Sequence, residues 1–589
     1  MEKTSFINYP GAVAVSISEI IKTDAGFYLT AWNITGVLFI LLLFFSVSLN
    51  FSISGFSKSR PGKIIGSSPA FLIFSGLALF ILRLPTLALP EQNMDESQWI
   101  VNAATWLNGA VLWKDVNGFT SGPLLFAPLT IMYYLSDGLN YANIRLFGLL
   151  FTIIPSVVII FLLFKKSFDH KIAALVTLPL VLFFSYSFSR DFISYESELI
   201  PMLLTCLCFY FFFSWKVKKN YYKIFLLGIT LGLFPFAKLQ AVPIAFSIFL
   251  CFSFELITAK EITSQKIIRH FLLLISAGIF PSLLLLFYLI KNNALTFFWN
   301  DYIIQNLYYA QSGLAYHISG FSKFLIPVII AKETPEAAWF FGFMFMLILI
   351  CSFVFFKNRN RISVSRKKET GYLLLVLVAA YFSVCMPGSY FYHYETLLII
   401  PVLVFAGSLA ANTFSFINEK PVFKKLFQAS VILMTGTPML LSLYFGNKGI
   451  DFVRSGGDFE ISAVSKEISK YAIPNEKLAV WGWNNKIYVE TELTQGTPGS
   501  NSFYETYTAL NNNNEKLDAY INAIKKNQPV IFLDAALPVF AGFKIQNGLS
   551  HENFSALSQF ISKNYTLVSI INQKKIYVLN EQLMKMGLL

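Results

Sequence analysis

Residues 90–125 read PEQNMDESQWIVNAATWLNGAVLWKDVNGFTSGPLL and hold the two adjacent carboxylates Asp95 and Glu96. An apolar run precedes the stretch, and the turn Ser121-Gly122-Pro123-Leu124 closes it before the next apolar segment. An amphipathic helix is expected after the carboxylates, with one apolar face formed by Trp99, Ala103, Trp106 and Leu107. Carboxylates beside hydrocarbon are costly to keep ionised, so the stretch is a candidate functional site.

The composition around this stretch indicates a polytopic membrane protein. The 589 residues are 55% hydrophobic and only 13% charged, with 62 phenylalanines, and the mean hydropathy is +0.58. A soluble chain of this length would carry about a quarter charged residues. The high hydrophobic fraction and the low charged fraction also exclude a disordered chain and a collagen-like repeat.

About twelve apolar stretches approach the roughly 20 residues that a spanning helix needs. They are 30–51, 70–89, 143–164, 171–189, 197–214, 222–237, 239–257, 271–290, 338–356, 371–387, 395–415 and 426–445. The predicted fold is therefore mainly α, a polytopic helix bundle.

The distribution of positive charge predicts the orientation of the bundle. Six alternate connections, 52–69, 165–171, 215–223, 258–270, 357–369 and 418–425, carry 22 Lys and Arg, whereas the rest of the chain before residue 446 carries 10. Cytoplasmic loops are the ones rich in Lys and Arg, so Asp95 and both chain ends are expected on the outer side. The net charge of +13 is then a topology signal and not a nucleic-acid footprint.

Two domains are expected: a membrane domain over 1–445, with outward loops 90–142 and 291–337, and an extracytoplasmic domain over 446–589. The second part is polar, and its runs 478–481, 530–533 and 575–579 predict strands, while 514–526 and 551–563 predict helices. This alternation predicts a small α/β domain.

Cysteines and targeting signals add little. The five cysteines lie in apolar stretches and suggest no disulfide framework or metal knuckle. The first 29 residues lack a basic region followed by an apolar region and a cleavage site, so no removable signal peptide is expected. Together these features favour a bacterial inner membrane.

The acidic couple has two interpretations. A partly desolvated carboxylate can accept a proton from a hydroxyl in the transition state. Alternatively, Asp95 caps the following helix and Glu96 lies solvated in its first turn.

The layout resembles the polytopic glycosyltransferases of the GT-C fold, especially bacterial relatives of protein O-mannosyltransferases and of lipid A aminoarabinose transferases. Those families place an acidic pair in the first large outward loop, then an amphipathic helix and a Lys-Pro-Pro-Leu turn. Asp95-Glu96, the helix and Pro123-Leu124 match that pattern. The chain departs from it at Ser121-Gly122, where the family has lysine.

The resemblance implies a reaction, transfer of a sugar from a polyprenyl-phosphate-linked donor to an acceptor hydroxyl outside the cytoplasm. It implies Asp95 as the general base, with Glu96 beside it, and Asp191 and Glu196 as groups that place the acceptor or donor. Lys238, Arg190 and His393 are the candidates for binding the lipid phosphate, because cations stabilise a departing phosphate. Snorkelling towards the headgroups is the competing interpretation for each basic residue and is the favoured one for Lys332. The acceptor could be a lipid, a glycan or a protein; membrane lipids surround the chain, and no nucleic acid is expected.

These residues leave a divalent metal open and commit the chain to no cofactor. The outward carboxylates together with His393 could hold Mg²⁺ or Mn²⁺. The sequence has no His-x-x-x-His and no tight Asp-x-Asp pair, so no metal site is predicted.

Aromatic residues in 291–323 and in VWGWNNKIYVET (480–491) are ambiguous. They are typical of a membrane interface, and they also suit a carrier groove or a sugar-stacking surface. Trp481 is expected in the protein core, whereas Trp483 could stack on a sugar.

Three other functions fit parts of the sequence. Twelve spans suit a transporter or flippase, but the charges gather on one side and leave the deep membrane almost uncharged. An envelope polymer ligase with a different fold would use similar lipid-linked substrates. A non-catalytic assembly factor would use the outer domain to bind partners.

Overall fold

The computed structural model describes residues 59–418 apart from 88, 137, 260 and 313–317, and residues 461–589 apart from 511–513 and parts of 537–548. Parts of 34–43 and of 433–441 are also described. Two predicted spans, 30–51 and 426–445, therefore lie largely outside the described residues.

Within the described part, eight helices are long and apolar enough to cross a membrane. They cover Ser68–Leu87, Tyr141–Ser167, Leu199–Val217, Leu239–Ile257, Ser264–Lys291, Pro335–Lys357, Val364–Cys385 and Tyr392–Ile417. Two further predicted spans are the shorter apolar helices His170–Tyr186 and Tyr221–Ala237. The total of twelve stays a prediction.

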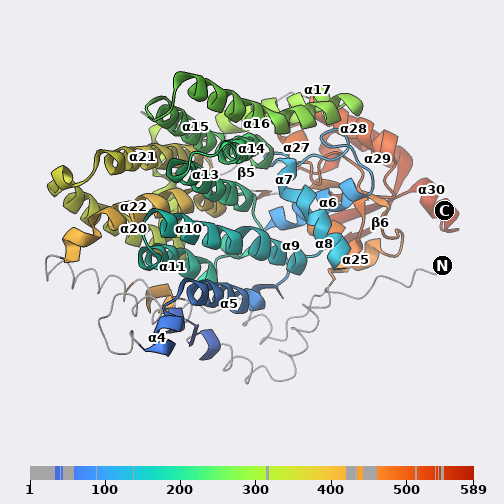
Figure 1. Cartoon of the computed structure of the whole chain (residues 1–589). Helices are drawn as coiled ribbons and strands as arrows, with labels where there is room; N and C mark the ends of the chain where they lie inside the picture. The colour runs from blue at the N-terminus through green and yellow to red at the C-terminus, as the bar shows by residue number, and fades with distance from the viewer. Residues whose placement is uncertain are drawn as a thin grey trace.

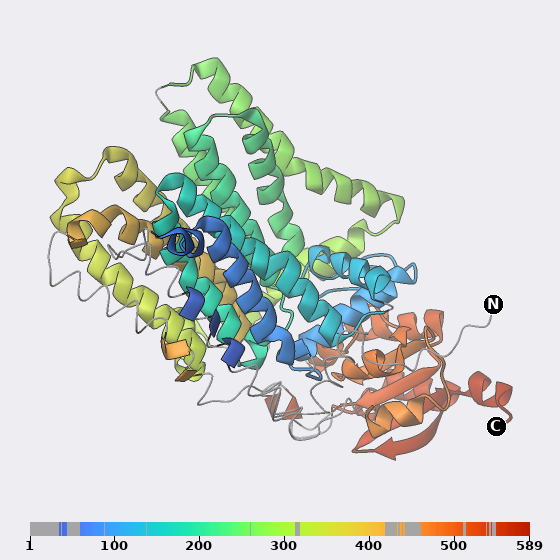
Figure 2. The ribbon, with the colours of Figure 1, turned by 60° about the horizontal axis from the view of Figure 1, so that its bottom comes forward.

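The bundle helices lie side by side in Figures 1 and 2. They are α5 (Ser68–Leu87), α9 (Tyr141–Gly148), η2 (Leu149–Ile153), α10 (Ile154–Ser167), α11 (His170–Tyr186), α13 (Leu199–Val217), α14 (Tyr221–Ala237), α15 (Val242–Ile257), α16 (Ser264–Lys291), α20 (Pro335–Lys357), α21 (Val364–Cys385) and α22 (Thr396–Asn418). A preceding short helix is α4 (Arg60–Ile65).

Helices α14 and α16 approach closely because glycines face each other. A Cβ on Gly232 would lie 2.0 Å from the carbonyl oxygen of Gly278, and one on Gly228 would lie 2.6 Å from that of Leu274. Small residues allow helix backbones to pack this tightly in a bilayer. The contact fixes the path of α14, which ends directly before Lys238.

Ion pairs join the helices at the end of α13 that is remote from Glu198. Lys216 pairs with Glu255 at 3.4 Å and with Glu369 at 2.8 Å, and Lys368 pairs with Glu255 at 2.8 Å. These contacts connect α13, α15 and α21. Glu198, at the other end of α13, belongs to a separate group of charged residues.

Short helices cover that other end of the bundle. They are α6 (Met94–Leu107), α7 (Pro123–Phe126), η1 (Ala127–Leu129), α8 (Thr130–Leu135), α12 (Arg190–Ile193), η3 (Leu239–Ala241), α17 (Leu295–Phe298), η4 (Trp299–Ile304), α18 (Gln305–Ser312), η5 (Gly320–Leu325), α19 (Ile326–Glu333) and η7 (Tyr392–Glu395). The remaining short helix, η6 (Arg359–Arg361), precedes α21. Figure 1 shows α6, α7 and α8 between the bundle and the C-terminal part of the chain.

The C-terminal part is α/β and has two clusters of buried apolar residues around its sheet. Its helices are α25 (Ala463–Ile468), α26 (Lys486–Thr491), α27 (Phe503–Leu510), α28 (Glu515–Asn527), η8 (His551–Asn553), α29 (Ser555–Asn564) and α30 (Asn580–Lys585). Its strands are β1 (Lys477–Gly482), β2 (Thr494–Gln495), β3 (Ile531–Ala535), β4 (Val539–Phe540), β5 (Phe543–Lys544), β6 (Tyr565–Ile571) and β7 (Lys574–Leu579).

The main sheet has the order β2-β1-β3-β7-β6. Strand β1 pairs in parallel with β2 and β3, whereas β7 pairs antiparallel with β3 and β6. The predicted strands at 478–481, 530–533 and 575–579 are confirmed as β1, β3 and β7. Trp481 is fully buried and its indole N–H donates to the carbonyl of Leu549 at 2.7 Å, which confirms its core role.

Candidate active site

Helix α6 begins at an asparagine cap. The side chain of Asn93 accepts a hydrogen bond from the backbone N–H of Asp95 at 3.1 Å, and its amide donates to Asp191 at 3.1 Å. Asp95 therefore lies in the first turn of the helix but does not cap it. The capping interpretation of Asp95 is wrong, because Asn93 occupies that position.

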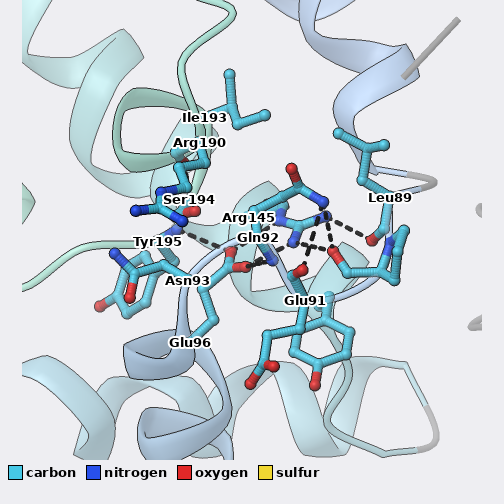
Figure 3. A network of polar contacts seen from close by, with 12 residues as sticks. Leu89, Glu91, Gln92, Asn93, Glu96, Arg145, Arg190, Ile193, Ser194 and Tyr195 are labelled. Atoms are coloured by element: carbon cyan, nitrogen blue, oxygen red, sulfur yellow. Dashed lines mark hydrogen bonds and ion pairs between the residues drawn. The ribbon is translucent and has the colours of Figure 1, made fainter. Parts of the chain in front are cut away.

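Glu96 faces the bundle and is fully buried in an ion pair with Arg145 (Figure 3). Arg145 reaches the two carboxylate oxygens at 2.7 and 2.6 Å. The backbone N–H of Tyr195 also donates to Glu96, at 3.0 Å. Glu96 is thus not solvated, and its hydrogen bonds connect three separate segments of the chain.

Arg145 uses its other N–H groups on the segment that leads into α6. It donates to the carbonyls of Thr86 at 2.9 Å, Leu89 at 2.7 Å and Pro90 at 2.8 Å. Figure 3 shows the guanidinium between Glu96 and this backbone. The start of α6 is therefore tied to α9 by one buried side chain.

The carboxylate of Asp95 does not take part in the contacts of Glu96 and lies near a different group of residues. One ligand atom each from Asp95, Glu196 and His393 lie within 4.8 Å of one another. Asp95 keeps partial exposure, whereas Glu196 and His393 are buried. Burial raises the pKa of the Asp95 carboxyl above its ordinary value, and the charges of His393 and Lys238 oppose the shift only in part.

Asp191 and Glu196 have opposite electrostatic surroundings. Burial alone would raise the pKa of Asp191, but its hydrogen bond to His393, at 3.3 Å, and the charge of Arg190 lower it below the ordinary value. Burial and the neighbouring carboxylates Asp95 and Asp191 hold the pKa of Glu196 well above its ordinary value. Neither oxygen of Glu196 has a hydrogen-bond partner among the described residues.

Lys238 forms the cationic side of the cluster. Its ammonium group donates to Ser197 at 2.7 Å and pairs with Glu198, and it lies 4.7 Å from the ring centroid of Tyr394. Burial alone would raise the pKa of Glu198, but Lys238 lowers it below the ordinary value. The hydroxyls of Tyr394 and Tyr309 lie 3.2 Å apart beside this pair.

The turn that departs from the lysine-containing motif packs against the end of α14. The N–H of Gly122 donates to the carbonyl of Ala237 at 2.9 Å, and Ser121 forms a bridge with Lys238. A Cβ on Gly122 would lie 2.1 Å from the carbonyl oxygen of Phe236. Glycine is required for this close approach, and the turn holds the backbone at Lys238.

The structure brings most predicted site residues together. Asp191, Glu196, Lys238 and His393 surround Asp95, and Arg190 stands at the edge with its side chain 63% exposed, 3.6 Å from Asp191. Lys332 is exposed at the end of α19, and its snorkelling towards the headgroups stays a prediction. Trp483 is half-buried, 5.7 Å from the ring of Phe503.

Sequence reasoning missed Arg145, Glu198 and the tyrosine pair. Arg145 had a signal, because an arginine at the start of an apolar helix is costly without a partner. Glu198 lies in the same loop as Asp191 and Glu196, and the resemblance favoured those two carboxylates over it. Tyr309 and Tyr394 were hidden among many interfacial aromatics.

The cluster could also hold a divalent cation. The trio Asp95, Glu196 and His393 offers two carboxylate oxygens and one imidazole nitrogen, a donor set that suits Mg²⁺, Mn²⁺ or Zn²⁺. The unpartnered oxygens of Glu196 fit such an occupant, and they fit a shared proton equally well.

Comparison with solved structures identifies the architecture. The crystal structure of ArnT from Cupriavidus metallidurans in the apo state matches with a TM-score of 0.53 at 12% identity, over 87% of this chain and 98% of that one. The chain has the GT-C fold. The Archaeoglobus fulgidus oligosaccharyltransferase, solved with Zn and sulfate, matches at a TM-score of 0.39 and 11% identity, over 86% of this chain and 72% of that one.

One family model matches part of the chain. The model described as dolichyl-phosphate-mannose-protein mannosyltransferase matches residues 69–298, which include α6 and Lys238. No curated protein matches the chain significantly. The family match and the GT-C fold together support a membrane glycosyltransferase of the GT-C type.

Proposed function

We propose that the protein transfers a sugar from a polyprenyl-phosphate-linked donor to an acceptor hydroxyl on the extracytoplasmic side of a bacterial inner membrane. The observation that carries the proposal is the placement of Asp95. Its partly exposed carboxylate has a raised pKa and lies beside the buried Lys238–Glu198 pair, at the bundle end that the C-terminal domain covers.

In the proposed reaction the oxygen of the acceptor hydroxyl attacks the anomeric carbon of the donor. Asp95 takes the proton of that hydroxyl as the attack proceeds. The bond from that carbon to the phosphate oxygen breaks, and the electron pair leaves with the polyprenyl phosphate. The leaving group is already anionic, so cations matter more than a strong acid. Release of the proton from Asp95 to solvent or to the phosphate completes the cycle.

Lys238, Arg190 and His393 supply positive charge for that phosphate. Lys238 is buried and held by Ser197 and Glu198, so a phosphate near it would meet a fixed donor. Arg190 is exposed at the edge of the cluster and can reach an incoming headgroup. His393 acts next to Asp191 and Glu196, which place the acceptor or donor in this proposal.

Glu96 has a positioning role in the proposal rather than a share in proton transfer. Its oxygens already accept hydrogen bonds from Arg145 and Tyr195. One carboxylate of the couple then acts on the substrate while its neighbour fixes the helix.

Replacement of Asp95 tests the function directly. Asp95→Asn keeps the size of the side chain but removes the base, and we expect sugar transfer to fall by about 10²–10⁴-fold. The measurement is transfer by purified protein supplied with a polyprenyl-phosphate sugar extract, after mass spectrometry with and without the gene has shown which envelope glycan, lipid or protein is modified.

Asp115→Asn is the matched control in the same loop. Asp115 accepts a hydrogen bond from the N–H of Val111 at 3.0 Å and lies 3.7 Å from Lys526, away from the cluster. We expect this variant to keep full activity. Full activity of a normally folded Asp95→Asn protein would instead favour a transporter or an assembly factor.

A further inference from the structure

Helix α6 is held at its start by the bundle and along its later turns by the C-terminal domain. The side-chain amide of Gln495 donates to the side-chain oxygen of Asn102 at 3.0 Å, and its backbone N–H donates to the hydroxyl of Thr105 at 3.2 Å. All three residues are buried, with exposed fractions of 3%, 0% and 5%. Strand β2 therefore covers the side of α6 that carries Asn102 and Thr105.

Gln495 stands on a rigid support. Strand β2 pairs with β1 with Gln495 opposite Leu478, and β1 runs through the apolar core. The next residue, Gly496, donates to the carbonyl of Leu478 at 2.8 Å and accepts from the amide of Asn527 at 2.9 Å. The Gln495 side chain therefore projects from a strand whose position the sheet sets.

The contact between α6 and β2 is made by two buried amides. Asn102 Nδ2 and Gln495 Oε1 have no hydrogen-bond partner among the described residues, and each unmet group costs about 1–3 kcal/mol. Two apolar side chains of similar size would avoid this cost. A buried polar contact with directional geometry favours one arrangement over shifted ones, which is a reason to place it where position matters.

Helical geometry connects this contact to Asp95. Asn102 follows Asp95 by seven residues, which is about two turns, so the two side chains leave the same face about 10 Å apart along the axis. The helix between them is almost wholly buried. A shift of Asn102 therefore moves Asp95 with it.

We propose that Gln495 is a positioning residue for the reaction and that the C-terminal domain sets the height and rotation of α6 through the Gln495–Asn102 contact. The inference rests on the proposed function for its kinetic consequence and gives the C-terminal domain a defined task. Together, the Glu96–Arg145 pair and this contact fix the helix in its first turn and again about two turns later.

The test uses the full chain in lipid nanodiscs. The variants are Asn102→Ala, Gln495→Ala, the double variant, and the exchanged pair Asn102→Gln with Gln495→Asn. Asn108→Ala and Asn475→Ala are the controls, because this exposed pair joins the end of α6 to the same domain at 3.2 Å. Each protein is measured by hydrogen exchange over 94–101 and by the kcat and KM of transfer.

We expect either single variant to lower kcat by about 10- to 100-fold, since small displacements of a reacting group have effects of this size, with KM for the donor nearly unchanged. The kcat of the double variant should be no lower than that of either single variant, and the exchanged pair should restore most of kcat. Exchange over 94–101 should rise in the single variants and stay unchanged in the controls.

Additive losses in the double variant, no recovery in the exchanged pair, or unchanged exchange over 94–101 would each overturn the proposal. Failure of the proposed function is a separate outcome. If Asp95→Asn remains fully active, the kinetic role is lost, and the exchange data alone decide whether β2 holds α6.

Discussion

Asp95 and Glu96 are adjacent in the chain but lie in different surroundings, because successive helix residues point about 100° apart. Glu96 points into the bundle and meets Arg145, a partner that neutralises its charge. Asp95 points to Glu196 and His393. A rotation of about 100° thus separates the carboxylate that is held in an ion pair from the one that we propose as the base.

A third carboxylate, Glu91, titrates near neutrality at the contact with the C-terminal domain. It accepts a hydrogen bond from Ser97, and the charges of Lys486 and Glu490 act on it across the contact. Burial, the largest effect, raises the pKa of Glu91 from 4.5 to about 7. The folded state therefore binds this proton more tightly than the unfolded state does.

We predict that Glu91→Gln changes the pH dependence of stability. A raised carboxyl pKa gives stability that is complete below about pH 4.5 and is lost as the pH rises to about 7. The loss is at most about 3 kcal/mol, since one pKa unit corresponds to about 1.4 kcal/mol. The unfolding temperature of the variant, relative to that of the natural protein, should rise between pH 5 and pH 8. The same difference in unfolding temperature at both pH values would contradict the raised pKa of Glu91.

At the scale of elements, the site depends on how α6 meets α9. Arg145 on α9 holds both Glu96 and the carbonyls of the segment before α6. Loss of Arg145 should therefore release the whole beginning of α6.

We predict that Arg145→Met destabilises the protein by about 3–5 kcal/mol, because it leaves the buried Glu96 without its cation. Methionine fills a similar volume, so lost packing contributes little. Denaturant unfolding in detergent measures the change. Lys470→Met removes an exposed pair with Glu467 and should leave the midpoint unchanged; equal effects of the two substitutions would refute the assignment.

Sequence patterns predicted the elements better than their partners. Hydropathy located most helices of the bundle, and short runs within the polar C-terminal part located β1, β3 and β7, because these signals are local. The Glu96–Arg145 pair joins residues 49 positions apart and the Gln495–Asn102 pair joins residues 393 positions apart, so no local pattern contains them. Lys238 and His393 were selected as candidates because they lie at the outer ends of apolar helices, where the resemblance also implies a lysine and a His-Tyr pair.

At the scale of the whole molecule, the two ends of the bundle have opposite chemistry. One end has Asp95, Asp191 and the C-terminal domain, and the other has the connections rich in Lys and Arg, among them 357–369. In a bilayer this asymmetry selects one orientation. Under the proposed function, the lipid-linked sugar donor presents its headgroup at the acidic end.

We predict that the acidic end lies outside the cytoplasm. The five natural cysteines are all buried, so single added cysteines can report exposure. Ser562→Cys on α29 and Ser365→Cys in α21 both replace exposed residues, at opposite ends of the molecule. A membrane-impermeant maleimide should label Ser562→Cys on intact spheroplasts and Ser365→Cys only after permeabilisation. The reverse pattern would place Asp95 in the cytosol, where no outward-facing lipid-linked donor could reach it, and would require a different substrate for the same cluster.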